Sequence, residues 1–508
     1  MKNNKPLGPV FWVSTITIFL LVIWGVSYPA QFENVATSAK DFANVNFAWF
    51  YLLSTFLFVS FCLFMAFSKY GKIRLGRDHE RPEYPFFTWV GMLFSCGFGV
   101  GLVFWGVAEP MTHFFSPPIG GLEEQSPAAA RVAMQYAFFH WGISQWSAFT
   151  IVGLAIAYFQ FRKQEDGLIS TTFNPLIGKG KKPLLRKSID TIAVIATVMG
   201  VATSLGQGIL QINGGLHSVF GTPADNNYMY LAIIGVLLAL YLTSSITGLD
   251  KGIKYLSNLN LGLALALMTF VFLTGPSVFI LESFILGIGD YLQNFVQLSF
   301  RLTPYTESTW VYQNTIFYWA WVIAWSPFVG AFVARVSRGR TIREFVMGVL
   351  IIPPMLGLVW IAVFGGTALN LDLFHGTQIA EAVNQNLTTS LFVTFNELPL
   401  SFLLSVMSIL LIFTFLITSA DSATYILGSM TSHGSLNPQL LVKVIWGILI
   451  AAIAGVLLKG GLDSLQSASL VAALPFTLLL FIVATSLVKA INAEKKSSSE
   501  ETKKVTNE

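Results

Sequence analysis

The sequence predicts an all-α polytopic membrane protein with twelve transmembrane helices. Its 508 residues are 54% hydrophobic and only 11% charged, whereas a soluble domain carries about 25% charged residues. Apolar stretches of about 20 residues, the length that crosses a bilayer, recur along the whole chain. The 44 Phe and 13 Trp residues add aromatic side chains suited to lipid contact and to the membrane interface.

Twelve apolar stretches of spanning length follow one another along the chain. We place the spans near 9–29, 48–68, 87–109, 134–160, 189–213, 228–248, 256–280, 313–336, 345–369, 402–430, 439–458 and 465–488. The first stretch also resembles a signal peptide, but no small-residue cleavage site follows it, so we expect a retained first helix. The amphipathic stretch 281–300 is polar enough to lie along the membrane interface, and the 370–400 loop is a second candidate for this position.

These spans divide the chain into five parts. We assign residues 1–86 to an N-terminal tail and two extra helices, 87–280 to a first five-helix repeat, 281–312 to an interfacial amphipathic helix, 313–488 to a second five-helix repeat and 489–508 to a cytoplasmic tail. The tail is rich in Lys, Glu and Ser and is expected to be disordered. Its role is either solubilising or regulatory, as a sensor of ions or anionic lipid.

Basic residues are distributed unevenly over this arrangement. With both termini in the cytoplasm, all but four of the 30 Lys and Arg residues fall on the cytoplasmic side, and the exceptions are Lys40, Arg131, Arg301 and Lys459. Cytoplasmic loops of membrane proteins carry an excess of Lys and Arg. The pattern therefore predicts cytoplasmic termini and supports the number of spans. The net charge of +4 is too small to indicate a nucleic-acid partner.

The third predicted span contains a glycine-rich segment, Ser95-Cys96-Gly97-Phe98-Gly99-Val100-Gly101. Each of its three glycines weakens a helix by roughly 1 kcal/mol relative to Ala. An unwound segment here would free backbone N–H and C=O groups for a ligand or an ion. Close helix packing explains the small residues equally well.

The eighth predicted span contains three Trp residues and a proline between Phe317 and Phe328. Pro327 cannot donate a helix hydrogen bond, so we expect an interruption there. Trp321 and Trp325 are four residues apart and lie on one helix face. An aromatic packing stripe is the alternative explanation.

The tenth predicted span holds two hydroxyls and a carboxylate, at Thr418, Ser419 and Asp421. Such groups are costly in a membrane unless they are paired or functional, and oxygen ligands of this kind suit a hard cation. We also expect this helix to be interrupted. Two alternatives are that the hydroxyls bond back to helix carbonyls and that Asp421 caps a half-helix near the cytoplasm.

The expected interruptions in the third and eighth spans lie five helices apart. Broken helices at matching positions of two halves point to inverted repeats with a binding site near the midplane. The fourth span adds Trp141, Trp146 and Phe149, and aromatic faces attract cations such as quaternary ammonium groups. His140 is expected to be a hydrogen-bonded structural residue. No nucleotide-binding loop, metal cluster or catalytic triad is recognisable, so we expect neither an enzyme nor an organic cofactor.

These motifs resemble those of the betaine/carnitine/choline transporter family. The most specific stretch runs from Phe317 to Phe345 and includes Ala334-Arg335-Val336-Ser337-Arg338-Gly339-Arg340-Thr341-Ile342-Arg343-Glu344-Phe345. The glycine-rich segment followed by Trp105-Gly106-Val107-Ala108-Glu109-Pro110, the pair His140-Trp141, and Thr418-Ser419 also fit. The resemblance covers essentially the whole chain.

The resemblance implies a fold similar to that of sodium-coupled amino-acid symporters, in a multi-pass protein of the bacterial inner membrane that is often a homotrimer. The substrate-binding residues that it implies are Trp141, Trp146, Phe149, Trp321, Val322, Trp325, Gly97, Phe98, Gly99 and Gly101. Phe149 stands where betaine carriers have Tyr, and Val322 stands where they have Trp. One face of the cage for the cationic group is therefore missing or supplied from elsewhere.

The resemblance also implies that sodium is the coupling ion. The implied ligands are the hydroxyls of Thr418 and Ser419 with backbone carbonyls near Ser95, Phe98 and Phe415. A second sodium site is suggested at Thr197 and Phe328. Val201 stands where another hydroxyl is expected for that site.

The leading interpretation is a sodium-coupled symporter that imports a small zwitterionic or quaternary-ammonium solute such as glycine betaine. The alternatives are a sodium-independent exchanger of choline or carnitine type, a carrier of a non-quaternary zwitterion such as ectoine or taurine, and a membrane sensor with vestigial transport.

Overall fold

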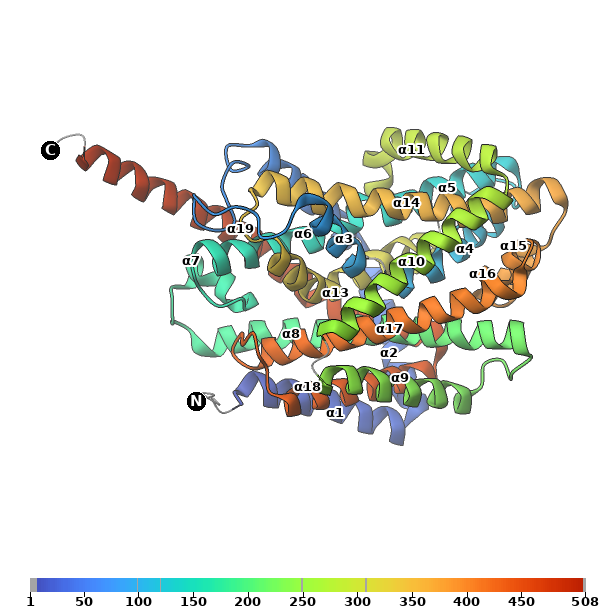
Figure 1. Ribbon diagram of the computed structural model, residues 1–508, viewed down its shortest axis with the longest axis horizontal. Helices are drawn as coiled ribbons and strands as arrows, with labels where there is room; N and C mark the ends of the chain where they lie inside the picture. The colour runs from blue at the N-terminus through green and yellow to red at the C-terminus, as the bar shows by residue number, and fades with distance from the viewer. Residues whose placement is uncertain (1–6, 98, 119, 248–249, 307, 506–508) are drawn as a thin grey trace.

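The computed structural model describes residues 7–97, 99–118, 120–247, 250–306 and 308–505, without the side chains of 94–97, 246–247, 250–254 and 495–505. The described residues form helices joined by short loops, with a single isolated β-bridge between Arg74 and Thr341. Most of the long helices run roughly parallel or antiparallel to one another in one bundle (Figure 1). The predicted all-α polytopic class is confirmed.

Eleven helical segments among the described residues are long and apolar enough to cross a membrane. They are α1 (Pro9–Ser27), α2 (Pro29–Phe67), α5 to η1 (Pro127–Arg162), α8 (Pro183–Phe220), α9 (Asn227–Thr247), α10 (Asp250–Thr274), α12 to α13 (Trp310–Val336), α14 (Ile342–His375), α17 (Ser401–Thr431), α18 (Leu440–Leu458) and α19 (Gly461–Val505). Each coincides with one predicted span. Their division into two inverted five-helix repeats stays a prediction.

The remaining predicted span, the third, is broken as the glycines predict. It consists of α3 (Phe86–Gly97) and α4 (Val100–Phe115), each shorter than the roughly 20 residues that cross a bilayer. Gly99 caps α4 in an extended conformation, with φ −120° and ψ −158°. That the two halves together form a twelfth span stays a prediction. Phe98 lies outside the described residues.

The fourth span is also broken, and the sequence did not suggest this. α5 (Pro127–Trp141) ends at Gly142, and α6 (Ile143–Ala157) begins directly after it. A Cβ atom on Gly142 would lie 2.5 Å from the Tyr291 hydroxyl, so the close approach requires glycine. The Ile143 N–H donates to that hydroxyl at 3.1 Å, which provides an acceptor outside the helix.

The interruptions expected in the eighth and tenth spans are wrong. α13 (Thr315–Val336) continues through Pro327, and α17 is unbroken. Proline frees the carbonyl four residues earlier, here that of Ile323, and the Ser326 hydroxyl donates to it at 2.7 Å. A neighbouring side chain therefore replaces the missing helix hydrogen bond, and the helix continues.

The other described helices are short or amphipathic. α11 (Ser277–Ser299) covers most of the predicted interfacial stretch and is not among the segments that could cross a membrane; its interfacial position stays a prediction. The 370–400 region is largely helical. The short elements are η2 (Ile169–Phe173), α7 (Asn174–Ile177), α15 (Ile379–Gln385), η3 (Leu387–Thr389) and α16 (Ser390–Asn396).

The predicted disorder from residue 489 onward is wrong as far as Val505, because α19 continues to that residue. Figure 1 shows its last turns projecting beyond the bundle. Glu494 attaches this helix to the end of the fourth span, with contacts of 2.5 Å to Arg162 and 2.6 Å to Lys163. These ion pairs hold α19 against the end of the fourth span beyond its apolar part.

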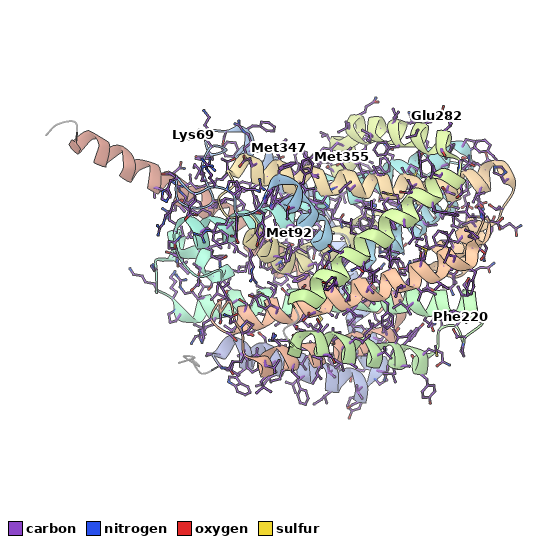
Figure 2. The ribbon with its side chains drawn as sticks, in the orientation of Figure 1. Lys69, Met92, Phe220, Glu282, Met347 and Met355 are labelled. Atoms are coloured by element: carbon purple, nitrogen blue, oxygen red, sulfur yellow. The ribbon has the colours of Figure 1, made fainter. Side chains whose placement is uncertain are left out.

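The start of α1 and the end of α19 lie at the same end of the bundle (Figure 1). Lys69, in the basic loop after α2, lies toward that end, whereas Phe220 at the end of α8 lies at the opposite end (Figure 2). This arrangement agrees with an even number of crossings. It also places one of the predicted cytoplasmic basic loops on the side of the termini.

The helix α13 is largely buried and packs mainly against α6, α19 and α8. All residues from Thr315 to Gly330 are buried. Because α13 carries Trp321 and Trp325, its central position places these rings in the middle of the bundle.

Candidate functional site

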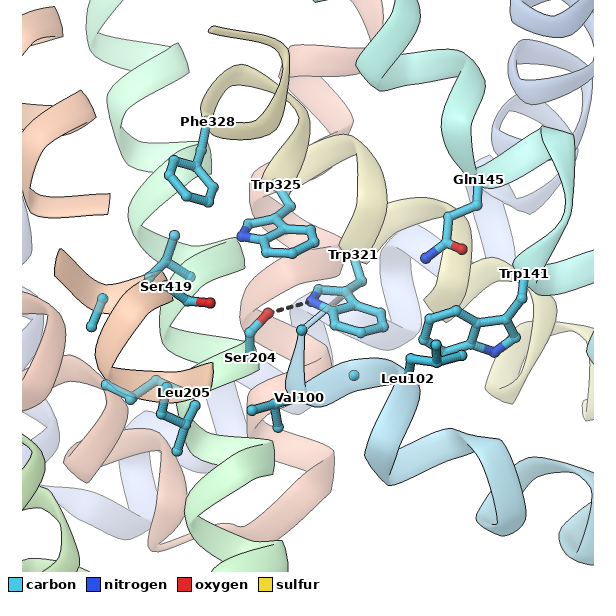
Figure 3. A pocket seen from close by; sticks show the side chains of 15 residues that line it. Val100, Leu102, Trp141, Gln145, Ser204, Leu205, Trp321, Trp325, Phe328 and Ser419 are labelled. Atoms are coloured by element: carbon cyan, nitrogen blue, oxygen red, sulfur yellow. Dashed lines mark hydrogen bonds between the residues drawn. The ribbon is translucent and has the colours of Figure 1, made fainter. Parts of the chain in front are cut away.

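A small cavity lies where the break in the third span meets α13. Its volume is about 30 Å³, room for roughly two water molecules. It is lined by Gly99, Val100, Gly101, Leu102, Trp141, Gln145, Val201, Ser204, Leu205, Trp321, Trp325, Phe328, Leu416, Ser419 and Ala420. Six helices, α4, α5, α6, α8, α13 and α17, contribute to this wall (Figure 3).

Aromatic rings form one side of the cavity. Trp321 and Trp325 stack with a centroid separation of 6.3 Å and an interplanar angle of 16°. Phe317 extends the stack below Trp321 at 5.7 Å. Trp141 meets Trp321 edge to face at 6.2 Å. The four-residue spacing along α13 thus builds a ring column, as expected for one helix face, and π faces of this kind attract cations.

The beginning of α4 forms another side. The first N–H groups of a helix have no acceptor within the helix, and the helix dipole gives this end a partial positive charge. The first turn, from Gly99 to Leu102, lines the cavity. A Cβ on Gly101 would lie 2.3 Å from Trp321, whereas one on Gly99 would meet only Ser419 Oγ, at 3.8 Å. Gly101 therefore allows the ring and the helix start to approach each other.

Two polar side chains that were not predicted from the sequence, Ser204 and Gln145, also line the cavity. Ser204 on α8 accepts a hydrogen bond from the Trp321 indole N–H at 3.1 Å and donates to the Gly200 carbonyl at 3.2 Å. Gln145 on α6 is 4% exposed and points toward the rings of Trp141 and Trp321 (Figure 3). The helical spacing could have indicated both residues. Gln145 follows the predicted lining residue Trp141 by one helical turn, and Ser204 follows Val201 by nearly one turn.

Several predicted substrate-binding residues lie outside the cavity lining. Trp146, Phe149 and Val322 are all buried. Phe149 packs edge to face against Trp146 at 5.4 Å and against Trp325 at 5.9 Å. Phe149 thus packs against the cavity ring of Trp325 without lining the cavity itself. Gly97 ends α3 and its exposure is not described, and Phe98 lies outside the described residues, so their predicted roles stay predictions.

The predicted sodium ligands lie on α17 beside the cavity. Ser419 lines it, whereas the Thr418 hydroxyl bonds back to the carbonyls of Phe415 at 3.0 Å and Thr414 at 3.1 Å. Asn260 donates to the Thr418 hydroxyl at 3.4 Å. The Thr418 hydroxyl thus bonds back to helix carbonyls, which was the alternative explanation. The bond to the Phe415 carbonyl also brings together two oxygens that are predicted sodium ligands. The Ser95 side chain lies outside the description.

The residues of the suggested second sodium site line the cavity or lie within one helical turn of a residue that does. Phe328 and Val201 line it, and Thr197 lies one helical turn before Val201. The Thr197 hydroxyl donates to the Ala193 carbonyl at 2.8 Å. The second sodium site stays a prediction.

Asp421 does not cap a half-helix, because α17 continues through it. Its carboxylate accepts a hydrogen bond from Ser244 at 2.7 Å. This contact joins α17 to α9 and gives the buried acid a partner.

A buried cluster of Glu109, His113 and His140 holds one of the cavity rings. Glu109 accepts a hydrogen bond from the Trp141 indole N–H at 2.7 Å, and its other oxygen lies 2.5 Å from His140 Nδ1 and 3.3 Å from His113 Nε2. His140 Nε2 lies 2.9 Å from the Thr315 hydroxyl. The prediction that His140 is a hydrogen-bonded structural residue agrees with these contacts.

The same three residues offer donor atoms within 4.8 Å of one another, as a metal site would. Two donors on a tetrahedral zinc ion, with bonds of about 2.0–2.1 Å, lie about 3.3 Å apart. The 2.5 Å contact between Glu109 and His140 is instead that of a strong hydrogen bond. In this arrangement the cluster holds the Trp141 ring in place through Glu109.

Comparison with known proteins identifies the family. Residues 9–496 match the sequence profile of the BCCT, betaine/carnitine/choline family transporters. The chain belongs to the betaine/carnitine/choline transporter family. It is therefore a multi-pass bacterial membrane transporter and not an enzyme.

Three relatives of known name cover almost the whole chain. An ectoine/hydroxyectoine transporter of Virgibacillus pantothenticus is 59% identical over 99% of this chain and 100% of its own length. The glycine betaine transporter OpuD of Bacillus subtilis is 48% identical over 97% and 96%. The betaine/ectoine transporter LcoP of Corynebacterium glutamicum is 37% identical over 96% and 78%.

Proposed function

We propose that this betaine/carnitine/choline family transporter is a sodium-coupled symporter for a small zwitterionic osmolyte of the ectoine or glycine betaine type. The observation that carries the proposal is the cavity, which sets stacked indole rings opposite the beginning of α4. A zwitterion carries the two charges that these two surfaces attract.

The cationic group would lie against Trp141, Trp321 and Trp325. Each cation–π contact contributes roughly 0.5–2 kcal/mol when it is desolvated. The carboxylate would accept hydrogen bonds from the N–H groups of Val100 and Gly101 in the first turn of α4, as anions do at helix N-termini. This arrangement disfavours simple cations such as choline, because they have no group for the beginning of α4.

The sodium-coupled part of the proposal rests on α17. The Thr418 hydroxyl and the Phe415 carbonyl lie 3.0 Å apart, close enough for both oxygens to contact one small cation. Hard cations prefer oxygen ligands. Ser419 Oγ, which lines the cavity, would connect the ion to the substrate. The alternative is a sodium-independent exchanger, for which these hydroxyls would be only helix back-bonds.

The relatives favour ectoine and glycine betaine as the solutes to test first, because their names state these substrates. We also propose cytoplasmic termini, from the distribution of basic residues, and a homotrimer, from the family resemblance.

Uptake of labelled ectoine and glycine betaine into proteoliposomes tests the proposal. We expect uptake driven by an inward sodium gradient and lost when potassium replaces sodium. Replacing Thr418 and Ser419 together with Ala should raise the sodium concentration for half-maximal uptake while leaving expression intact. Uptake that ignores sodium would favour the exchanger, and wild-type sodium dependence of the double variant would show that the ligands are wrongly assigned.

A further inference from the structure

The buried amide oxygen of Gln145 in the cavity wall has no hydrogen-bond partner among the described residues. The whole residue is only 4% exposed. Another polar lining side chain, Ser204, is already bonded to Trp321 and Gly200. A buried polar atom without a partner costs roughly 1–3 kcal/mol, so the position calls for a partner that the described protein does not supply.

The position of Gln145 indicates which part of a bound substrate would lie beside its amide. Gln145 lies four residues after Trp141, across the break at Gly142, and its side chain points toward the rings of Trp141 and Trp321 (Figure 3). These are the rings that would hold the cationic group of a bound zwitterion. An amide beside them meets the cationic group and not only the carboxylate.

A side-chain amide offers a carbonyl acceptor as well as N–H donors, whichever way it is turned. A quaternary ammonium group has no N–H and cannot use this acceptor. The cyclic amidinium group of ectoine has N–H groups, and so do primary, secondary and tertiary ammonium groups.

We infer that Gln145 is a specificity-determining residue that accepts a hydrogen bond from an N–H of the substrate's cationic group. The site therefore favours zwitterions with N–H donors over fully methylated ones. This inference rests on the proposed function and names the substrate class within it: N–H-bearing zwitterions, of which ectoine is one.

The matched variants are Gln145→Met and Gln207→Met. Methionine has nearly the length of glutamine but no hydrogen-bonding amide. Gln207 on α8 is also fully buried, with no hydrogen-bond partner for its amide among the described residues, but it is not part of the cavity wall. It therefore controls for the loss of a buried amide elsewhere in the bundle.

The experiment measures competition for uptake in proteoliposomes by ectoine, by glycine betaine, and by dimethylglycine, which differs from glycine betaine by one N–H in place of a methyl group. In Gln145→Met we expect the half-inhibitory concentrations of ectoine and dimethylglycine to rise about tenfold, while that of glycine betaine changes less than about twofold. Gln207→Met should change all three by the same factor. Size-exclusion chromatography in detergent identifies variants that fail to fold.

Two outcomes overturn the inference. If Gln145→Met weakens all three solutes equally, the amide meets the shared carboxylate. If it weakens none, the amide does not contact the substrate. If Gln145→Met does not fold, the more conservative Gln145→Glu replaces it. Glu keeps an acceptor, so this variant should still bind dimethylglycine more tightly than glycine betaine, and failure to do so would contradict the inference. Failure of the proposed function looks different, because the wild-type protein would then take up neither ectoine nor glycine betaine.

Discussion

Glu109 links three helices at the edge of the cavity. It lies on α4, bonds to His140 and Trp141 on α5, and through His140 reaches Thr315 at the start of α13. A charged hydrogen bond to a cavity ring fixes the orientation of that ring more firmly than packing alone. We therefore regard Glu109 as a positioning residue for Trp141.

Glu109→Ala should raise the solute concentration for half-maximal uptake by about tenfold or more, because a hydrogen bond to a charged group contributes about 1.5–3 kcal/mol and about 1.4 kcal/mol is a factor of ten. Glu109→Gln, which keeps an acceptor for the indole N–H, should have a smaller effect. Initial-rate kinetics of uptake distinguish a higher half-saturation concentration from a lower maximal rate. A folded Glu109→Ala protein with the wild-type half-saturation concentration would contradict the positioning role.

The two glycines at the start of α4 should respond differently to substitution. Gly101→Ala places a Cβ 2.3 Å from the Trp321 ring, and such overpacking costs about 1–3 kcal/mol. Gly99→Ala meets only ordinary contact and should fold normally, while Gly99→Leu should abolish uptake because its side chain would enter the cavity. Uptake and thermal stability of the three variants check this. Normal uptake by Gly99→Leu would favour a packing role for the glycines.

The predictability of individual residues depended on whether their partners are local. The spacing of Trp321 and Trp325 on one helix face was visible in the sequence, as was Trp141. Whether Trp146 and Phe149 line the cavity depends on how α6 crosses α13, which no local pattern specifies. The unpartnered state of Gln145 likewise depends on side chains from other helices.

At the scale of elements, hydropathy located the eleven described segments that could cross a membrane, because the requirement for apolar length is local. The breaks were less predictable. Three alternate glycines predicted the break between α3 and α4 correctly. The break at Gly142 depends on Tyr291, about 150 positions later in the chain, and the expected break at Pro327 is prevented by Ser326.

Tyr291→Phe tests the break between α5 and α6. The variant removes the acceptor for the Ile143 N–H, and a buried unpaired donor costs about 1–3 kcal/mol. We expect a lower midpoint of thermal unfolding in detergent, with Tyr305→Phe as a matched control, since Tyr305 is 97% exposed. An unchanged midpoint in Tyr291→Phe would show that this hydrogen bond does not stabilise the break.

At the scale of the whole molecule, the cavity is too small for the proposed solutes. A volume of about 30 Å³ admits water but not a molecule of the size of glycine betaine. Binding therefore requires the rings or the beginning of α4 to move apart. The elements around the cavity that can move are those beside the breaks, because α3 and α4 are not joined by a continuous helix ladder. In contrast, every residue of α13 from Thr315 to Gly330 is buried.

The central claim is that a zwitterion binds between the indole column and the beginning of α4. A cryo-electron microscopy structure of the purified protein with sodium and ectoine tests it most directly. We predict solute density in a widened cavity, with the cationic ring against Trp321 and Trp325 and the carboxylate at the N–H groups of Val100 and Gly101. Solute density at another place, or a carboxylate directed at the indole faces, would contradict the account.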